Sequence, residues 1–396
     1  MIHKKLGAAI DIGTTTVALY LTDMETGKRL AVKSGVNTQS SHGADVTSRI
    51  LYCSRNGHET LTKLIREQIS SMLSEACRAT GTQADNIEYI TVAGNTIMQH
   101  LAAGYSPASM GTAPFTPVSL FGEETPVWDE LPVSRSAKIF YTPAVSAYVG
   151  GDVTAGLLAT GFESIPEPAI FLDIGTNGEM VIKCGKTYYC CATAAGPAFE
   201  GAEITMGMAA ADGAVDHVNL NKDSNSIEYS VIGGGVPVGL CGSGLLDTLA
   251  MLLETGAVDE TGRLDRDRFW LNKNDGIYIT AGDIRKLQLA KAAIAAGIQV
   301  LLHYAGIPVS DVKSLTIAGG FGSYMEPESA ARIGLFPKSL LPKAKISGNT
   351  AGEGAVMALT SEDARTQLKN IKSRCECIEL SASAFFNEKF VEQMAF

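Results

Sequence analysis

The tetrapeptide Asp-Ile-Gly-Thr occurs twice in this chain, at residues 11–14 and 173–176, each time at the end of an apolar run. A strand that ends this way presents a carboxylate at the edge of its sheet, and the glycine lets the next backbone amides approach an anion closely. Two such edges facing one another would clamp a nucleotide and its metal.

Each copy is followed by a strand, a turn and a returning strand. After the first copy these segments are 16–22, 25–28 and 30–32; after the second they are 179–183, 185–186 and 187–192. Chance recurrence of four residues does not explain such an extended similarity. The duplication therefore predicts two related three-strand meanders.

With 396 residues the chain is too long for one ordinary core, since a domain averages roughly 150 residues. Strands alternate with helical patterns, which indicates α/β units with mixed sheets. We expect a first lobe at 1–165 and a second at 166–377. We expect the C-terminal amphipathic helix, about 378–396, to rejoin the first lobe.

Composition excludes several classes of protein. The net charge of −10 and the lack of a basic cluster argue against a nucleic-acid surface. No run approaches the roughly 18 apolar residues of a membrane span, and no secretory signal opens the sequence, so we expect a cytoplasmic protein. Eight cysteines are too sparse for a disulfide scaffold and are expected to be reduced thiols.

Two common nucleotide-binding motifs are absent. The sequence contains no Gly-x4-Gly-Lys-Ser/Thr, and no Gly-x-Gly-x-x-Gly follows a first strand. Three other segments, in this order along the chain, resemble motifs of the actin, heat-shock ATPase and sugar kinase (ASKHA) superfamily. Residues 11–16 resemble its first phosphate motif, 173–178 its second, and 317–322 its adenosine motif.

This resemblance implies a two-lobe, actin-like ATPase fold, a duplicated ribonuclease-H-like α/β fold with a nucleotide cleft between the lobes. It implies that Asp11 and Asp173 hold Mg²⁺ through water, since Mg²⁺ keeps most of its hydration shell. Asp152, at the start of a helix, would orient the attacking water, although an Asp there is also a good helix cap. The residues expected to contact ATP are Gly13, Thr14, Thr15, Thr16, Gly175, Thr176, Asn177, Gly178, Gly242, Ser243, Gly319, Gly320, Phe321 and Gly322.

A closer resemblance comes from four longer strings: 37–39 with 43–50, 93–96, 195–201 and 239–247. They look like the ATPase part of reductive activators of corrinoid proteins. This family couples ATP hydrolysis to uphill electron transfer that returns Co(II) corrinoids to Co(I). The resemblance also implies a homodimer with a corrinoid or other low-potential redox protein as its partner.

The cysteine pattern departs from this family, whose activators carry an iron–sulfur domain. Cys375 and Cys377 form only a pair, Cys190 and Cys191 point to opposite faces of a strand, and the other cysteines are scattered. No four-cysteine cluster spacing is present. We therefore expect no iron–sulfur cluster in this chain and a separate ferredoxin-like electron donor.

Several alternatives remain open at this stage. A small-molecule kinase of the same fold would use Asp152 to activate a substrate hydroxyl, and an ATP-gated assembly protein would need no catalysis. Gly242 and Ser243 could line the adenine or ribose pocket or simply let a helix pack closely. For Asn95 and Glu200, structural capping is the favoured role.

Overall fold

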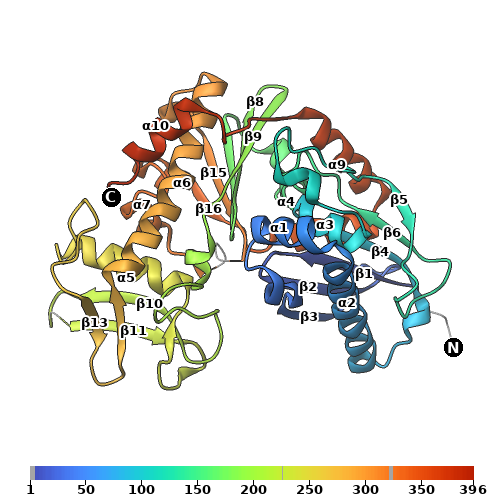
Figure 1. Cartoon of the computed structure of the whole chain (residues 1–396), viewed down its shortest axis with the longest axis horizontal. Coiled ribbons are helices and arrows are strands. Elements are labelled where there is room, and N and C mark those ends of the chain that lie inside the picture. The colour runs from blue at the N-terminus through green and yellow to red at the C-terminus, as the bar shows by residue number, and fades with distance from the viewer. Residues whose placement is uncertain (1–4, 225, 321–323) are drawn as a thin grey trace. The chain divides into compact units, whose positions relative to one another are not determined.

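The computed structural model describes residues 5–224, 226–320 and 324–396 and divides the chain into two compact units. Unit 1 comprises Met1–Ser164 and Asn349–Cys377, and unit 2 comprises Ile165–Gly348 and Ile378–Phe396 (Figure 1). Each unit contains one copy of the repeated tetrapeptide at the end of a buried strand.

A mixed sheet forms the centre of unit 1, with strand order β3-β2-β1-β4-β6-β5. Its strands are β1 (Leu6–Ile12), β2 (Thr16–Asp23), β3 (Arg29–Val36), β4 (Ile87–Gly94), β5 (Glu124–Pro126) and β6 (Lys138–Tyr141). The helices are α1 (Val46–Asn56), α2 (Glu59–Thr80), α3 (Thr96–Ala103), α4 (Gly151–Ala159), α8 (Thr350–Thr360) and α9 (Glu362–Arg374), followed by the short β17 (Cys375–Cys377).

Helices cover both faces of this sheet because side chains alternate along its strands. Ile10 of β1 belongs to a core that includes residues of α1, α2 and α3. Ala9, the preceding residue, packs instead with Ala155 of α4 and Ala355 of α8. The small residues on this second face let α4 and α8 lie close to the strands.

Unit 2 contains a second mixed sheet, in which the order β16-β15-β7-β8-β9 is observed. Its strands are β7 (Ala169–Ile174), β8 (Gly178–Cys184), β9 (Thr187–Thr193), β15 (Ser314–Ala318) and β16 (Ala344–Ile346). The helices are α5 (Gly242–Glu254), α6 (Ala281–Ala305), α7 (Pro327–Arg332) and α10 (Ala384–Glu392). Two smaller sheets contain β10 (Ala214–Asn221), β11 (Ser226–Val231), β12 (Gly239–Leu240), β13 (Arg268–Asn272) and β14 (Ile277–Thr280).

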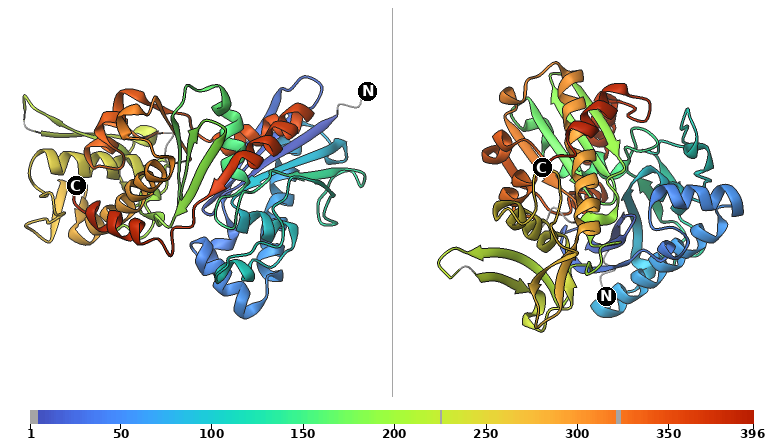
Figure 2. Two further views of the ribbon diagram at one scale, coloured as in Figure 1. Left: turned by 90° about the horizontal axis from the view of Figure 1, so that it is seen from above. Right: turned by 60° about the vertical axis from the view of Figure 1, so that its left-hand side comes forward.

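The β10–β11 hairpin extends away from the rest of unit 2 in both views of Figure 2. Short 3-10 helices occur in the loops of both units. They are η1 (Thr38–His42), η2 (Ala84–Asn86), η3 (Ala108–Gly111), η4 (Phe162–Ser164), η5 (Pro197–Glu200), η6 (Ile232–Gly234), η7 (Val309–Asp311) and η9 (Lys338–Lys343).

Both predicted meanders are confirmed, as β1-β2-β3 and β7-β8-β9 with antiparallel pairing throughout. The duplication extends further than the sequence indicated. In each unit the first strand of the meander also pairs in parallel with a later strand, β4 in unit 1 and β15 in unit 2. The two sheets therefore share the order β3-β2-β1-β4-β6 and β9-β8-β7-β15-β16.

The expected assignment of the C-terminal segment is wrong. Asn349–Cys377, not the last helix, belongs to unit 1. Glycine explains the placement of α8, because a Cβ on Gly354 would lie 2.1 Å from the Ala155 carbonyl oxygen of α4. The final helix α10 packs on α6 of unit 2, where Phe385 stacks on His303 at 4.3 Å between ring centroids.

Helix α6 contradicts the expectation that no apolar segment approaches the length of a membrane span. It is long and apolar enough by composition to cross a membrane, but 78% of its apolar window is buried inside the structure. Its residues form part of the core of unit 2. A core helix of a folded domain meets the same length and composition criteria as a membrane span, so α6 is explained by packing.

Candidate functional site

The first predicted phosphate turn connects β1 to β2. The backbone N–H of Gly13 donates to the Thr16 carbonyl at 2.9 Å and closes the turn. A Cβ on Gly13 would lie only 2.7 Å from that same carbonyl oxygen. Glycine is therefore required for the close approach of the two backbone segments.

Three successive carbonyls of this turn are held from one side. The Gly13 carbonyl accepts from Asn37 Nδ2 at 2.8 Å, and the Thr14 carbonyl accepts from Arg49 Nη2 at 2.7 Å. The Thr15 carbonyl accepts from the Asn37 backbone N–H at 2.8 Å. In a planar trans peptide the N–H points opposite to the carbonyl. The N–H groups of Thr14 and Thr15 therefore point away from Asn37 and Arg49, as in anion-binding turns.

Asp11, just before this turn, is held by an asparagine from the returning segment. Asn349 Nδ2 donates to Asp11 Oδ2 at 2.9 Å and to the Tyr20 hydroxyl at 3.3 Å. The side-chain oxygen of Asn349 accepts from the Gly352 N–H at 2.9 Å and caps α8. Burial raises the pKa of Asp11 to about 6, and the hydrogen bond from Asn349 opposes that rise.

Asp152 lies in the first turn of α4, where its Oδ1 accepts from the Val153 N–H at 2.8 Å. Burial, together with the nearby charge of Asp11, raises the pKa of this carboxyl to about 7, and the hydrogen bond from Val153 opposes the rise. Two carboxylates that disfavour each other's charge form a place where a cation is stabilised. The structure thus brings Asp11 and Asp152 into one electrostatic environment.

Glycines bring the start of α4 against the start of α3. A Cβ on Gly150 would lie 2.5 Å from the Asn95 Cα. Asn95 caps α3 by accepting from the Met98 N–H at 2.9 Å, and its Nδ2 donates to the Thr14 hydroxyl oxygen at 3.0 Å. The capping role predicted for Asn95 is confirmed, and the same side chain also contacts the turn.

The second turn, between β7 and β8, has different supports. The Gly175 N–H donates to the Asn177 carbonyl at 2.9 Å, and the Thr176 hydroxyl donates to Glu200 Oε2 at 2.9 Å. Glu200 lies at the end of η5, so it holds the turn in addition to ending a helix. A Cβ on Gly178 would lie 2.9 Å from side-chain atoms of Ile294, and this strand therefore packs tightly on α6.

The predicted adenosine motif follows β15, next to the end of β7. Gly319 has a φ of +99°, and a Cβ there would lie 2.3 Å from the Ile174 carbonyl oxygen and 2.6 Å from Asp173 Oδ1. Only glycine fits this approach. The space around the Cβ position of Gly320 is open, whereas the predictions for Phe321 and Gly322 fall outside the described residues.

The start of α5 is packed closely in this structure. Ser243 is buried, and its hydroxyl lies 3.4 Å from the thiol of Cys241. A Cβ on Gly244 would lie 2.2 Å from the Val215 carbonyl oxygen of β10. Close helix packing thus accounts for Gly244, while a nucleotide contact by Gly242 and Ser243 stays a prediction.

Three supporting residues received no role from the sequence: Asn37, Arg49 and Asn349. Asn37 and Arg49 lie inside one of the strings that resemble corrinoid-protein activators, which was the available signal. Asn349 had only the signal of an Asn before a helix. None of the eight cysteines forms a disulfide, and the described residues contain no group of three or more His, Cys, Asp or Glu arranged to hold a metal ion.

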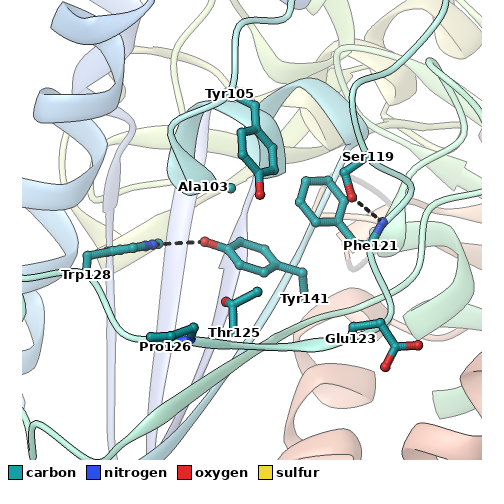
Figure 3. A pocket seen from close by; sticks show the side chains of 9 residues that line it. All are labelled: Ala103, Tyr105, Ser119, Phe121, Glu123, Thr125, Pro126, Trp128 and Tyr141. Carbon is teal, nitrogen blue, oxygen red and sulfur yellow. Dashed lines mark hydrogen bonds between the residues drawn. The ribbon is translucent and has the colours of Figure 1, made fainter.

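A separate aromatic pocket of about 200 Å³ lies in unit 1 (Figure 3). Trp128 Nε1 donates to the Tyr141 hydroxyl at 3.1 Å within it. None of the predicted site residues lines this pocket. Its lining residues are Ala103, Tyr105, Ser119, Phe121, Glu123, Thr125, Pro126, Trp128 and Tyr141.

Comparison with protein families covers nearly the whole chain. The family described as the C-terminal domain of RACo, the ASKHA domain, matches residues 167–396, and the RACo middle region matches residues 6–164. The ASKHA match confirms the expected actin-like α/β fold class.

Two curated relatives and one solved structure are also similar to most of this chain. The corrinoid activation enzyme RamQ of Eubacterium limosum is 35% identical, over 98% of this chain and 70% of RamQ. A [Co(II) methylated amine-specific corrinoid protein] reductase of Methanosarcina barkeri is 27% identical, over 84% of this chain and 66% of that protein. The structure of a reductive activator for corrinoid, iron-sulfur protein matches with a TM-score of 0.92 and 37% identity, over 100% of this chain and 66% of that one. The chain thus spans about two thirds of the length of these relatives.

Proposed function

Because this chain belongs to the RACo family, we propose that it binds ATP with Mg²⁺ and couples ATP hydrolysis to the reductive activation of a corrinoid protein. Its relatives are named as a corrinoid activation enzyme, a corrinoid protein reductase and a reductive activator. The observation that carries the nucleotide part is the repeated turn. Each copy spans the end of a strand that finishes in Asp-Ile, and in each unit a glycine at the end of the parallel neighbour strand approaches that strand end.

The side chains around these turns fit Mg²⁺, which prefers carboxylate oxygens and bound water. Asp11 and Asp173 would hold the hydrated ion, and the raised pKa of Asp152, about 7, suits a general base that takes a proton from water. When bound, Mg²⁺ neutralises phosphate charge and ATP supplies the phosphoryl group. The chain's own contribution is to bind the phosphates through the amides and hydroxyls of Thr14, Thr15, Thr16 and Thr176.

Glycines and polar residues of both units complete the proposed nucleotide site. Gly13 allows close backbone approach, Gly178 lets its strand pack on the side chains of Ile294 and Thr193, and Gly175 and Asn177 lie in the second turn. Gly319 and Gly320 are proposed to face the adenosine, together with Gly242 and Ser243 at the start of α5. These roles come from the motifs of the family and from the geometry of each turn within its own unit.

The proposed redox step transfers one electron to the cobalt of a corrinoid protein. Co(II) is reduced to Co(I), and an iron–sulfur protein of the ferredoxin class is oxidised by one electron. Hydrolysis of ATP to ADP and phosphate drives this uphill transfer. We propose that the protein acts in the cytoplasm as a homodimer and receives its electrons from a separate chain.

The proposal is tested under anaerobic conditions by mixing the protein with a Co(II) corrinoid protein, a reduced ferredoxin and Mg-ATP. The expected result is a Co(I) absorption spectrum that appears only when ATP is present. ATP hydrolysis without any Co(I), across several corrinoid proteins, would overturn the redox part. A thermal unfolding temperature unchanged by Mg-ATP would overturn the nucleotide part.

A further inference from the structure

Arg49 of α1 is a buried cation behind the first turn. Its side chain is 0% exposed, and its donors contact only neutral acceptors. Nε donates to the Gly43 carbonyl at 3.0 Å, and Nη2 donates to the Thr14 carbonyl at 2.7 Å. Nη1 donates to Gln39 Oε1 at 3.2 Å and contacts Met98 Sδ at 2.9 Å.

This guanidinium has no partner of opposite charge at contact distance. In the described part of the chain, no carboxylate oxygen lies within 4.0 Å of it. Burial lowers the pKa of Arg49 to about 10, and the more distant charge of Asp45 opposes that change. The group therefore stays charged at neutral pH, although burying an unpaired charge is costly.

The hydrogen bond from Arg49 to the Thr14 carbonyl extends the influence of this charge to the opposite side of the turn. A carbonyl that accepts from a cation is more strongly polarised, and the polarisation strengthens the N–H of the same peptide group as a donor. That N–H belongs to Thr15, and the planar peptide directs it away from Arg49. The positive charge thus favours an anion that the turn itself would bind.

We propose that Arg49 is a positioning residue that acts through the Thr14–Thr15 peptide, holding the turn and adding the positive potential that binds the phosphate chain of a nucleotide. A local cation favours anion binding at this turn because the protein as a whole carries a charge of −10. The inference rests on the proposed nucleotide site. It adds a residue and a mechanism to that site.

The test compares ligands of different phosphate charge on the full-length wild-type protein and on Arg49→Gln and Arg49→Lys. Affinities for ATP, ADP, adenosine and inorganic tripolyphosphate are measured with Mg²⁺ by calorimetry. We expect Arg49→Gln to weaken ATP and tripolyphosphate binding by about tenfold, which matches one charge acting over several ångströms. We expect ADP to be affected less, adenosine to be unaffected, and Arg49→Lys to keep most of the phosphate-dependent affinity.

Arg66→Gln is the matched control. Arg66 is another poorly exposed arginine of unit 1, whose Nε donates to a backbone carbonyl, that of Ala102, at 3.0 Å. Its loss should change stability but not the dependence of affinity on phosphate charge. Equal weakening of ATP and adenosine by Arg49→Gln would show general structural damage and overturn the proposal.

A measurement on the wild-type protein covers the case in which Arg49→Gln does not fold. With ¹⁵N-threonine labelling, tripolyphosphate should shift the amide resonance of Thr15 strongly, and unchanged Thr14 and Thr15 resonances at saturation would overturn the proposal. Wild-type protein that binds tripolyphosphate but not ATP would contradict the proposed function, and weaker tripolyphosphate binding by Arg49→Gln would then still support a role of Arg49 in phosphate binding. Wild-type protein that binds neither would remove both.

Discussion

The two copies of the repeated turn lie in sheets with the same strand order, but different side chains hydrogen-bond to them. In unit 1 the Thr14 hydroxyl oxygen accepts from Asn95, and the Thr14 carbonyl accepts from Arg49. In unit 2 the Thr176 hydroxyl donates its proton to the carboxylate of Glu200. Two sheets with the same strand order therefore differ at the turn, which is bonded to the cation of Arg49 in unit 1 and to the carboxylate of Glu200 in unit 2.

This difference changes what each threonine can offer. A hydroxyl that accepts from Asn95 keeps its own proton to donate, which suits a phosphate oxygen. A hydroxyl that donates to Glu200 keeps mainly acceptor capacity, which suits metal-bound water better than a phosphate. The comparison refines the expectation that all four threonines serve the phosphates in the same way.

The largest expected effect comes from the aspartates that the two turns have in common. Asp11→Asn and Asp173→Asn should each lower ATP hydrolysis by about 10³-fold, because each removes a charge needed to hold Mg²⁺. Phosphate release measures the effect, and Asp129→Asn, at a fully exposed ion pair, serves as control. If only one of these variants lost most of its ATP hydrolysis, the two aspartates would not share a role despite their equivalent places in the two sheets.

Next in size are the glycines that let parallel strands approach each other. Gly94→Ala and Gly319→Ala should each lower the free energy of unfolding by about 3 kcal/mol, since both have positive φ and a Cβ would lie 2.7 Å or less from a backbone oxygen. The matched controls are Gly27→Ala and Gly185→Ala, which have positive φ but open space. They should cost about 1 kcal/mol.

The two tryptophans let each unit be followed separately during denaturation. Trp128 belongs to unit 1 and Trp270 to unit 2. In a Trp270→Phe background, fluorescence reports on unit 1, and in a Trp128→Phe background it reports on unit 2. If Gly94→Ala were no more destabilising than Gly27→Ala, the steric argument for the strand ends would fail.

A smaller effect on the free energy of unfolding is expected at acidic pH, and it should be specific to unit 1. The ring of His100 is completely buried: Nδ1 lies 2.7 Å from the Thr96 carbonyl, and Nε2 accepts from the backbone N–H groups of Val118 and Ser119. A second proton has no acceptor there, and burial lowers the pKa of His100 to about 4.

Between pH 6.5 and 4 the unfolded chain therefore binds more protons at this histidine than the folded chain does. The contribution of His100 to the free energy of unfolding should therefore fall by about 2 kcal/mol at pH 5, whereas the raised pKa values of Asp11 and Asp152 in the same unit act in the opposite direction. Urea denaturation followed by Trp128 fluorescence at pH 7, 6 and 5 measures the change. Relative to wild type, the change in stability of His100→Gln between pH 7 and pH 5 should be more favourable by about 2 kcal/mol, and a pH dependence identical to that of wild type would rule out a contribution from His100.

The smallest expected effects belong to the side chains that distinguish the two turns. Asn95→Ala and Glu200→Ala should each lower ATP hydrolysis by about fivefold, equivalent to one hydrogen bond of about 1 kcal/mol. Glu200→Gln can still accept from Thr176, so it isolates the carboxylate charge. If Glu200→Gln had no effect while Glu200→Ala did, the support in unit 2 would be a hydrogen bond and not an electrostatic one.

The strand frame could be predicted because it depends on local patterns. Alternating apolar residues, the repeated Asp-Ile-Gly-Thr and turn glycines specify both meanders without any long-range information. The supports behind the turns could not be predicted in this way. Arg49 reaches Thr14 across 35 positions of sequence, and Asn349 reaches Asp11 across 338. Whether such side chains meet depends on how helices pack, which periodicity does not encode.

The error at the C-terminus has the same origin. An amphipathic helix reveals that one face will be buried, but not which sheet will cover it. The small residues of α8 were the available clue, since Gly352 and Gly354 permit contacts with Tyr20 and Ala155 that a larger residue would prevent. Helix α6 illustrates a related limit, because composition alone does not separate a core helix from a membrane span.

The chain leaves unit 1 at Ser164 and returns to it only at Asn349. On the ribosome, the segment that contains α8 therefore emerges after almost all of unit 2 has been made. Until then Asp11 lacks the asparagine that holds it, and the α4 face of the first sheet lacks its partner helix. Nascent unit 1 must wait in an incomplete state while unit 2 is synthesised, so the later half of the gene governs when the earlier half can finish folding.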